Sequence, residues 1–135
     1  MKTIEQIEAI QTAKPDTELR VCRRAEMGTV LHQGDVYLHR VADDWPRGKE
    51  LGTRQVAVGS TVGARHIVEG DVVVLEGTTL PPGMDPVPEL LGPVVVVGGD
   101  SAVLTHPEHA HHQFPCGVWQ VTYQLDLVTR QRVAD

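Results

Sequence analysis

Cysteine and aromatic residues are scarce in this sequence. Its 135 residues include two cysteines, two tryptophans, two tyrosines and one phenylalanine. Cys22 and Cys116 are too few and too far apart for the disulfide framework of a small secreted domain or for a Cys-x-x-Cys metal motif. With so few aromatic rings, the core has to be built from valine, leucine and isoleucine.

The sequence also has no long apolar run and no excess of positive charge. A membrane-spanning helix needs about 18 or more consecutive apolar residues, and no stretch approaches that length. The first ten residues lack the apolar centre of a signal peptide, so we expect a cytoplasmic location. A formal net charge of −6 at pH 7 opposes binding to a phosphate backbone, so nucleic acid is not an expected partner.

What is present is the composition of one globular domain with a short N-terminal appendage. Hydrophobic residues make up 41% and charged residues 22% of the chain, which excludes wholesale disorder. Residues 3–13 predict an amphipathic helix, in which Thr3 and Gln6 can form a capping box and three isoleucines fall on one face. We expect this helix to pack on the domain or against a second copy of the chain. The predicted division is an N-terminal helix and linker over 1–26 and a β-domain over 27–135.

The β-domain is predicted from short β-branched runs separated by glycine. The expected strands cover residues 35–41, 54–58, 66–68, 71–75, 93–97, 102–105 and 117–128. Gly98, Gly99 and Asp100 form a tight-turn signal, so we expect the runs on either side to form a hairpin. Many short strands without βαβ alternation favour a mainly β fold, a small antiparallel β-barrel or sandwich with one short N-terminal helix.

Two polar segments are expected to be loops. Residues 42–53 contain Trp45, and residues 77–93 are too rich in proline for a regular central strand. The second loop crosses the surface or covers a site. Trp45 and this proline-rich loop are also candidate contact surfaces for a protein partner.

Histidines are concentrated near the C-terminal end of the chain, where four of the seven fall within residues 106–112. Pro107 suits the first position of a helical turn, which would place His106 and His109 on one side. An extended segment would instead pair His109 with His111. Either geometry presents two imidazoles to a divalent metal such as Zn²⁺ or Fe²⁺, which needs a further ligand from elsewhere.

His66 is the best candidate for that further ligand, so the predicted metal set is His66, His106 and His109. Glu69 and Glu108 are the candidate catalytic carboxylates, able to ligate the metal, orient an imidazole or act as general base on a bound water.

The remaining polar residues carry weaker signals. Arg65, next to His66, is the candidate for holding an anionic substrate, although its charge can equally repel a metal. Cys116 is a lesser candidate for a ligand or a nucleophile. The other histidines are expected to be structural or solvated: His32, His39, His111 and His112.

Five stretches form a recognisable combination of motifs. They are GDVYLHR at 34–40, GSTVGARH at 59–66, LTHPEH at 104–109, PCGVWQVTYQ at 115–124 and RQRVAD at 130–135. Together they resemble a group of small uncharacterised bacterial proteins, and the resemblance implies that His66, His106, Glu108 and His109 lie together in space. Ala64 stands where the group's pattern has a histidine, which raises the alternative of a degenerate site. A fainter likeness to cupins, in HIVEGDVVVLEG and FPCGVWQV, supports a β-barrel and is only an analogy for function.

Two functions are compatible with these observations. The first is a histidine-lined site that binds a divalent metal or another small ligand, with catalysis left open. The second is a non-catalytic accessory or assembly module with a degenerate site, which contacts a protein partner or forms homo-oligomers through residues 3–13.

Overall fold

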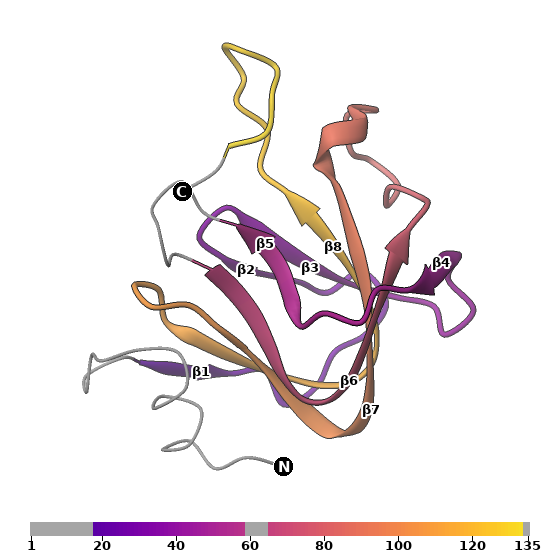
Figure 1. The fold of residues 1–135 in the computed structure, drawn as a ribbon, viewed down its shortest axis with the longest axis vertical. Coiled ribbons are helices and arrows are strands. Elements are labelled where there is room, and N and C mark those ends of the chain that lie inside the picture. Colours follow the sequence, from indigo (N-terminus) through magenta and orange to yellow (C-terminus); the bar gives the residue numbers. More distant parts are fainter. Residues whose placement is uncertain (1–17, 59–64, 134–135) are drawn as a thin grey trace.

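The computed structural model describes residues 18–58 and 65–133, which form a mainly β fold (Figure 1). Its strands are β1 (Leu19–Val21), β2 (Val30–Gln33), β3 (Val36–Val41), β4 (Arg47–Glu50), β5 (Gln55–Val58), β6 (Arg65–Gly77), β7 (Leu91–Thr105) and β8 (His111–Tyr123). A 3₁₀ helix, η1 (Pro88–Leu90), precedes β7 and buries Leu90. The helix predicted over 3–13 lies outside the described residues. Within the described ranges, no helix has the length and apolar character needed to cross a membrane.

The strands form one sheet, antiparallel at every pairing except that of β1 with β8. The order along the sheet is β2–β3–β8–β7–β6–β4, with β1 added beside the start of β8 and β5 beside the start of β6. Among the strands of the described residues, none pairs β2 with β4 to close the circle. The sheet is therefore open: the predicted mainly β fold is confirmed, and of the two predicted architectures, barrel or sandwich, the barrel is wrong.

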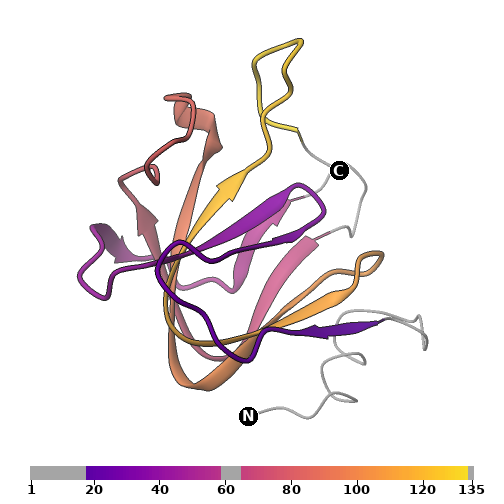
Figure 2. The same ribbon diagram turned by 180° about the vertical axis from the view of Figure 1, so that it is seen from behind.

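Three long strands carry this open sheet through a sharp bend (Figures 1 and 2). The pairing register shifts between Gly70 and Val72 in β6 and between Val97 and Ser101 in β7. Bulges of this kind bend a strand and increase its twist. We call the part holding β2, β3 and β4 the first half-sheet and the part holding β1 and β5 the second half-sheet; β6, β7 and β8 contribute to both.

The bend overturns the predicted hairpin. Residues 98–100 lie inside β7, which continues to pair with its neighbours on both sides of them. In the same way, the two runs predicted over 66–68 and 71–75 are parts of the single strand β6. Glycine and aspartate mark a bulge here, a position that uses the same residue types as a tight turn. The last strand also starts and ends earlier than the predicted 117–128.

One apolar cluster fills the space between the two half-sheets. Its largest members, Phe114 and Trp119, meet edge to face with ring centroids 5.3 Å apart. Valine, leucine and alanine supply the other buried residues of this cluster, as the scarcity of aromatics predicts. Truncating a buried ring such as Trp119 to alanine would cost about 3–5 kcal/mol. At one end of this interface, the apolar residues give way to buried polar side chains.

Candidate functional site

The rings of the three histidines predicted as a set lie together in a bent row with His106 at the corner, and the ring centroids of His66 and His109 are 6.1 Å apart. His66 projects from the start of β6, His106 follows β7, and His109 lies in the connection to β8. The ring centroids of His66 and His106 are 4.5 Å apart, and those of His106 and His109 are 4.4 Å apart. His66 and His106 are 0% and 1% exposed, whereas His109 is partly exposed. The row therefore runs from the interior towards the surface.

His106 closes the turn between β7 and β8. The backbone N–H groups of Glu108 and His109 donate to its Nδ1 atom at 3.0 and 3.3 Å. A ring nitrogen that accepts carries no proton, so the hydrogen of the neutral imidazole is on Nε2. This capped turn replaces the helical turn predicted from Pro107.

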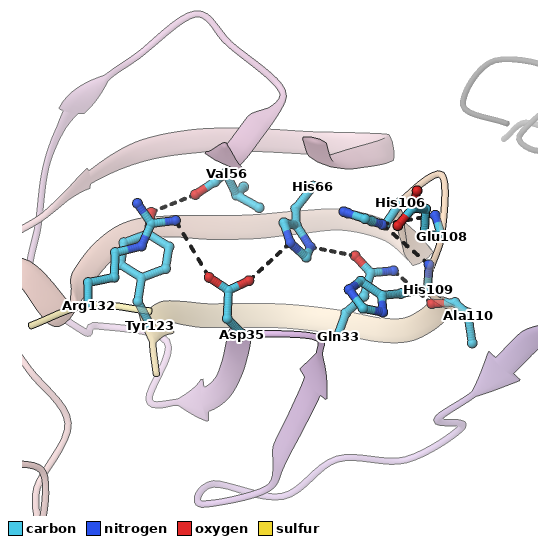
Figure 3. A network of polar contacts seen from close by, with 10 residues as sticks. All are labelled: Gln33, Asp35, Val56, His66, His106, Glu108, His109, Ala110, Tyr123 and Arg132. Carbon is cyan, nitrogen blue, oxygen red and sulfur yellow. Dashed lines mark hydrogen bonds and ion pairs between the residues drawn. The ribbon is translucent and has the colours of Figure 1, made fainter. Parts of the chain in front are cut away.

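Gln33, at the end of β2, fixes the orientation of the His66 ring (Figure 3). Its Nε2 atom donates to the carbonyl oxygens of Leu104 and Ala110 at 2.9 and 2.8 Å, which turns the amide oxygen towards β6. That oxygen lies 2.8 Å from Nδ1 of His66. Because an amide oxygen only accepts, Nδ1 of His66 carries a hydrogen and donates it. One amide thus connects β2, β6 and the turn before β8.

Asp35 faces the other nitrogen of the same ring. Its Oδ1 atom lies 3.4 Å from Nε2 of His66, and both side chains are at most 1% exposed. Since Nδ1 already holds a hydrogen, this contact is attractive only when a further proton lies on Nε2 or on the carboxyl group. Arg132 lies 3.9 Å from the second oxygen, Oδ2, and favours the ionised carboxylate.

The turn between β2 and β3 brings these two partners to His66. Gly34 has a φ of 57°, in the left-handed region that glycine adopts without strain. The residues on either side of it, Gln33 and Asp35, are each 1% exposed. This short turn is therefore the element that positions both hydrogen-bonding partners of the ring.

Tyr123 continues the polar contacts beyond Asp35 (Figure 3). Its hydroxyl donates to the carbonyl oxygen of Val56 at 2.6 Å, which ties the end of β8 to β5 across the fold. The guanidinium of Arg132 lies 4.0 Å from the centroid of the Tyr123 ring. Burial raises the pKa of Tyr123 above its usual value, so the phenol stays protonated and keeps donating.

The other predicted site residues do not join this row. Glu108 is exposed and contributes its backbone N–H rather than its carboxylate. Glu69 is 5% exposed, but strand alternation places it on the face of β6 opposite to His66. Arg65 and Cys116 are both exposed.

A metal ion would have to compete with the contacts already made by these rings. In the described ranges, no group of three or more histidine, cysteine, aspartate or glutamate side chains is arranged to hold one. The nitrogens of His66 face Gln33 and Asp35, and Nδ1 of His106 faces backbone N–H groups. The metal set of His66, His106 and His109 stays a prediction.

The exposed end of the row opens on a hollow of about 270 Å³. It lies between the start of β1 and β8 on one side and the β2–β3 turn on the other. Its lining residues are Arg20, His32, Gln33, Gly34, His109, Ala110 and His112. Three imidazoles and a guanidinium line the hollow, and no acidic side chain is among the described residues that line it.

His112, which lines this hollow, is kept in its neutral form by its surroundings. Burial is the main cause that lowers its pKa to about 4, and the positive charge of Arg20 adds to it. Glu18, which lies 3.6 Å from Arg20, acts in the opposite direction. At neutral pH, His112 is therefore an uncharged ring beside a cation.

Comparison with known families matches residues 32–124 to a domain of unknown function (DUF8820). The chain belongs to this family. No curated protein matches the chain, and no solved structure does. The stretch that matches the DUF8820 domain includes Gln33, Asp35 and the three predicted histidines, whereas Arg20 and Arg132 lie outside it.

Gln33 and Asp35 are the site residues that sequence reasoning missed. Both flank a glycine in the run His-Gln-Gly-Asp, which is typical of an exposed turn. The sequence feature that could have found them is their position directly between two strands, because a side chain there points either to solvent or to the core. Their contacts with His66 of β6, a distant part of the chain, show that they point inward.

Proposed function

We propose that this member of the DUF8820 family binds a small anion, a phosphate or carboxylate group, in the hollow lined by Arg20, His109 and His112. The single observation that supports this proposal is the composition of the hollow, in which cationic and imidazole groups gather without a described acidic lining residue. Arginine and histidine N–H groups form charge-assisted hydrogen bonds with such anions. Arg20, rather than the predicted Arg65, is then the residue that holds the anionic group.

The buried part of the row supports the hollow and takes no direct part in binding. Gln33 lines the hollow and also holds His66, so the wall of the hollow is fixed from behind. His66 itself is 0% exposed and lies outside the lining. The proposal is therefore one of ligand binding, with no reaction assigned.

A divalent metal such as Zn²⁺ or Fe²⁺, held by His66, His106 and His109, is the second candidate. It is supported by the contiguous rings, with centroid distances of 4.5 and 4.4 Å. Binding a metal would require His66 to give up its contact with Gln33 or Asp35. It also conflicts with the hydrogens that His106 accepts from the backbone.

Calorimetric titration separates the two candidates. Orthophosphate and ZnCl₂ are titrated separately, at neutral pH, into protein without a histidine tag. If the hollow binds anions, Arg20→Gln weakens phosphate binding by about fivefold or more, the loss expected for one charge-assisted hydrogen bond. Arg24→Gln removes the same charge from an exposed arginine outside the hollow and serves as the matched control.

The outcomes are distinct. Equal losses in the two arginine variants, or no phosphate binding at about 10 mM, would reject the anion site. Stoichiometric zinc binding that His66→Ala and His109→Ala each abolish would favour the metal instead.

A further inference from the structure

A second, larger groove lies on the outer face of the first half-sheet, away from the histidine row. It consists of two adjoining hollows of about 580 and 520 Å³, which share Val30, His39, Gly83 and Met84. Volumes of this size are typical of small-molecule sites. The larger hollow is bounded by Trp45, Arg40 and Met27 from one side and by the Pro81–Pro82 segment from the other.

The aromatic wall of the larger hollow is held in a fixed orientation. The indole Nε1 of Trp45 donates to Oε1 of Gln120 at 2.9 Å. Gln120 is 0% exposed, and its Nε2 donates to the carbonyl oxygens of Gly92 and Val121 at 2.8 and 2.9 Å. Those bonds fix which way the amide points and therefore which way the indole lies. Trp45 also packs on Val94 and the other apolar residues of a second small cluster.

His39, at the junction of the two hollows, is equally fixed. Its Nε2 atom lies 2.7 Å from the hydroxyl of Thr122, which is 0% exposed. Burial lowers the pKa of His39 below its usual value, so the ring is neutral at pH 7. A groove with such pre-oriented polar groups among apolar ones loses little entropy when a ligand binds.

Arg40 supplies the charge of the larger hollow. Its side chain is 17% exposed; the guanidinium is ion-paired at 3.4 Å with Asp43, whose side chain is 86% exposed, and donates to the carbonyl oxygens of Val41 and Val118. The guanidinium sits over Gly117, where an added Cβ atom would lie 2.5 Å from Cζ, so the absence of a side chain there makes room for it. Among the described residues that line this hollow, none is acidic, whereas Asp85 lines the adjoining hollow. Arg40 therefore presents a positive charge beside an apolar, aromatic wall.

The mouth of the groove is apolar as well. Met27 is 72% exposed and Val30 is 49% exposed, and both line the larger hollow. Exposed apolar side chains gathered around a hollow indicate a site that a ligand covers. Met27 and Met84 are flexible side chains that can adapt to the shape of a ring.

We propose that this groove binds a small aromatic carboxylate, with its ring against Trp45 and its carboxylate beside Arg40. The site is separate from the histidine-lined hollow and shares no lining residue with it. It gives Trp45 a small molecule as its partner, in place of the protein contact predicted from the sequence.

The two indole N–H groups of the protein make this proposal directly testable. Trp45 lies in the groove, whereas Trp119 is 0% exposed in the core and donates to the carbonyl oxygen of Pro115. Two-dimensional ¹H–¹⁵N NMR resolves one indole signal from each. The probes are 2-naphthoate and 2-naphthamide, which share a ring system and differ in charge. We expect 2-naphthoate to shift the Trp45 signal saturably and to leave the Trp119 signal in place, with affinity about tenfold higher than that of the amide.

Variants test the role of charge without dismantling the groove. Arg40→Gln should reduce the preference for the carboxylate to about twofold or less. Val30→Asp places a negative charge at the exposed mouth and should weaken naphthoate binding about fivefold. Val21→Asp makes the same change at a 45% exposed valine of β1 that does not line the groove, and should have no effect.

Three results would overturn the proposal. They are the absence of a Trp45 shift at about 5 mM naphthoate, equal shifts of both indole signals, and equal affinity for the acid and the amide. Because Arg20 and His109 lie elsewhere, none of these results bears on the anion site proposed above.

Discussion

The buried and the exposed histidines at one end of this fold differ in what their surroundings do to them. His66 and His106 are enclosed, and their ring nitrogens face Gln33, Asp35 and backbone N–H groups. His109 and His112 line an open hollow with a guanidinium nearby. The rings of His106 and His109 are nevertheless only 4.4 Å apart.

This difference shows that proximity of imidazoles does not by itself define a ligand site. A buried imidazole has to satisfy both nitrogens, so it acts as a connector between strands. Here Gln33 connects the β2–β3 turn to His66 of β6 and to the turn before β8. An imidazole beside open space can instead meet a ligand. Function is therefore expected at the exposed end and stability at the buried end.

The largest effect is expected when the buried ring is removed. His66→Leu leaves the Asp35 carboxylate and the Gln33 amide oxygen facing an apolar side chain, at a cost of about 3–5 kcal/mol in the free energy of unfolding. His109→Leu, at the partly exposed end, should cost less than about 1 kcal/mol. Urea denaturation measures both values.

A double variant keeps the test informative if His66→Leu alone does not fold. Asp35→Asn in the His66→Leu background removes the uncompensated charge and should recover about 1–2 kcal/mol. Equal costs for the two single leucine variants would mean that buried His66 contributes no more to the stability of the fold than partly exposed His109 does.

The second-largest loss of stability is expected for Gln33, because its side chain holds the buried His66 and also lines the hollow at the exposed end. Gln33→Leu removes three hydrogen bonds and leaves two buried carbonyl oxygens without their donor, so we expect a loss of about 2–3 kcal/mol by urea denaturation. Gln113→Leu is the matched control, because the Gln113 side chain donates one hydrogen bond, to Ser101 Oγ at 2.9 Å, and its loss should cost about 1 kcal/mol. A Gln33 variant no less stable than the Gln113 variant would show that Gln33 does not stabilise the fold by connecting these elements.

The sequence was sufficient to predict part of this arrangement. Histidine spacing pointed to His106 and His109, and the family resemblance placed His66 with them; the three ring centroids lie within 6.1 Å of one another. Alternation and β-branched runs predicted the mainly β fold and an aliphatic core. The His106–His109 pair and the strand runs are local features, since each depends on residue types within one short stretch.

The remaining features depend on contacts between distant stretches. Residues 98–100 have the composition of a tight turn, but pairing of β7 with β6 and β8 on both sides makes them a bend in one strand. Gln33 and Asp35 have the composition of a surface turn, but the folding over of the sheet places them against β6. Register and tertiary packing override local preference in both cases.

A smaller effect is expected in the pH dependence of stability, and it tests the contribution of His112 at the exposed end of the row. Burial and Arg20 lower the pKa of His112 to about 4 in the folded protein, whereas an unfolded histidine titrates at about 6.5. The unfolded state therefore binds more protons between these values, so stability is fully present above pH about 6.5 and declines as the pH falls towards 4. Allowing for partial exposure to solvent, we expect a loss of about 1–2 kcal/mol from this group.

His112→Gln is the variant that isolates this contribution. Its unfolding free energy, measured by urea denaturation at several pH values, should fall less steeply between pH 6.5 and 4 than that of the parent protein. Parallel pH curves for the two proteins would show that His112 does not carry the effect.

The smallest effect expected is a change in the pKa of His112 itself, followed by NMR of the imidazole ring. A phosphate bound beside the ring stabilises its charged form, so saturating phosphate should raise the pKa by about 0.5 unit, or about 0.7 kcal/mol. Arg20→Gln should raise the pKa without phosphate, and Glu18→Gln should lower it further, because these two charges act on the ring in opposite directions. If phosphate leaves the pKa of His112 unchanged while both variants shift it as expected, then His112 responds to nearby charges but no phosphate binds in the hollow. That result would reject the anion site proposed at the exposed end of the row.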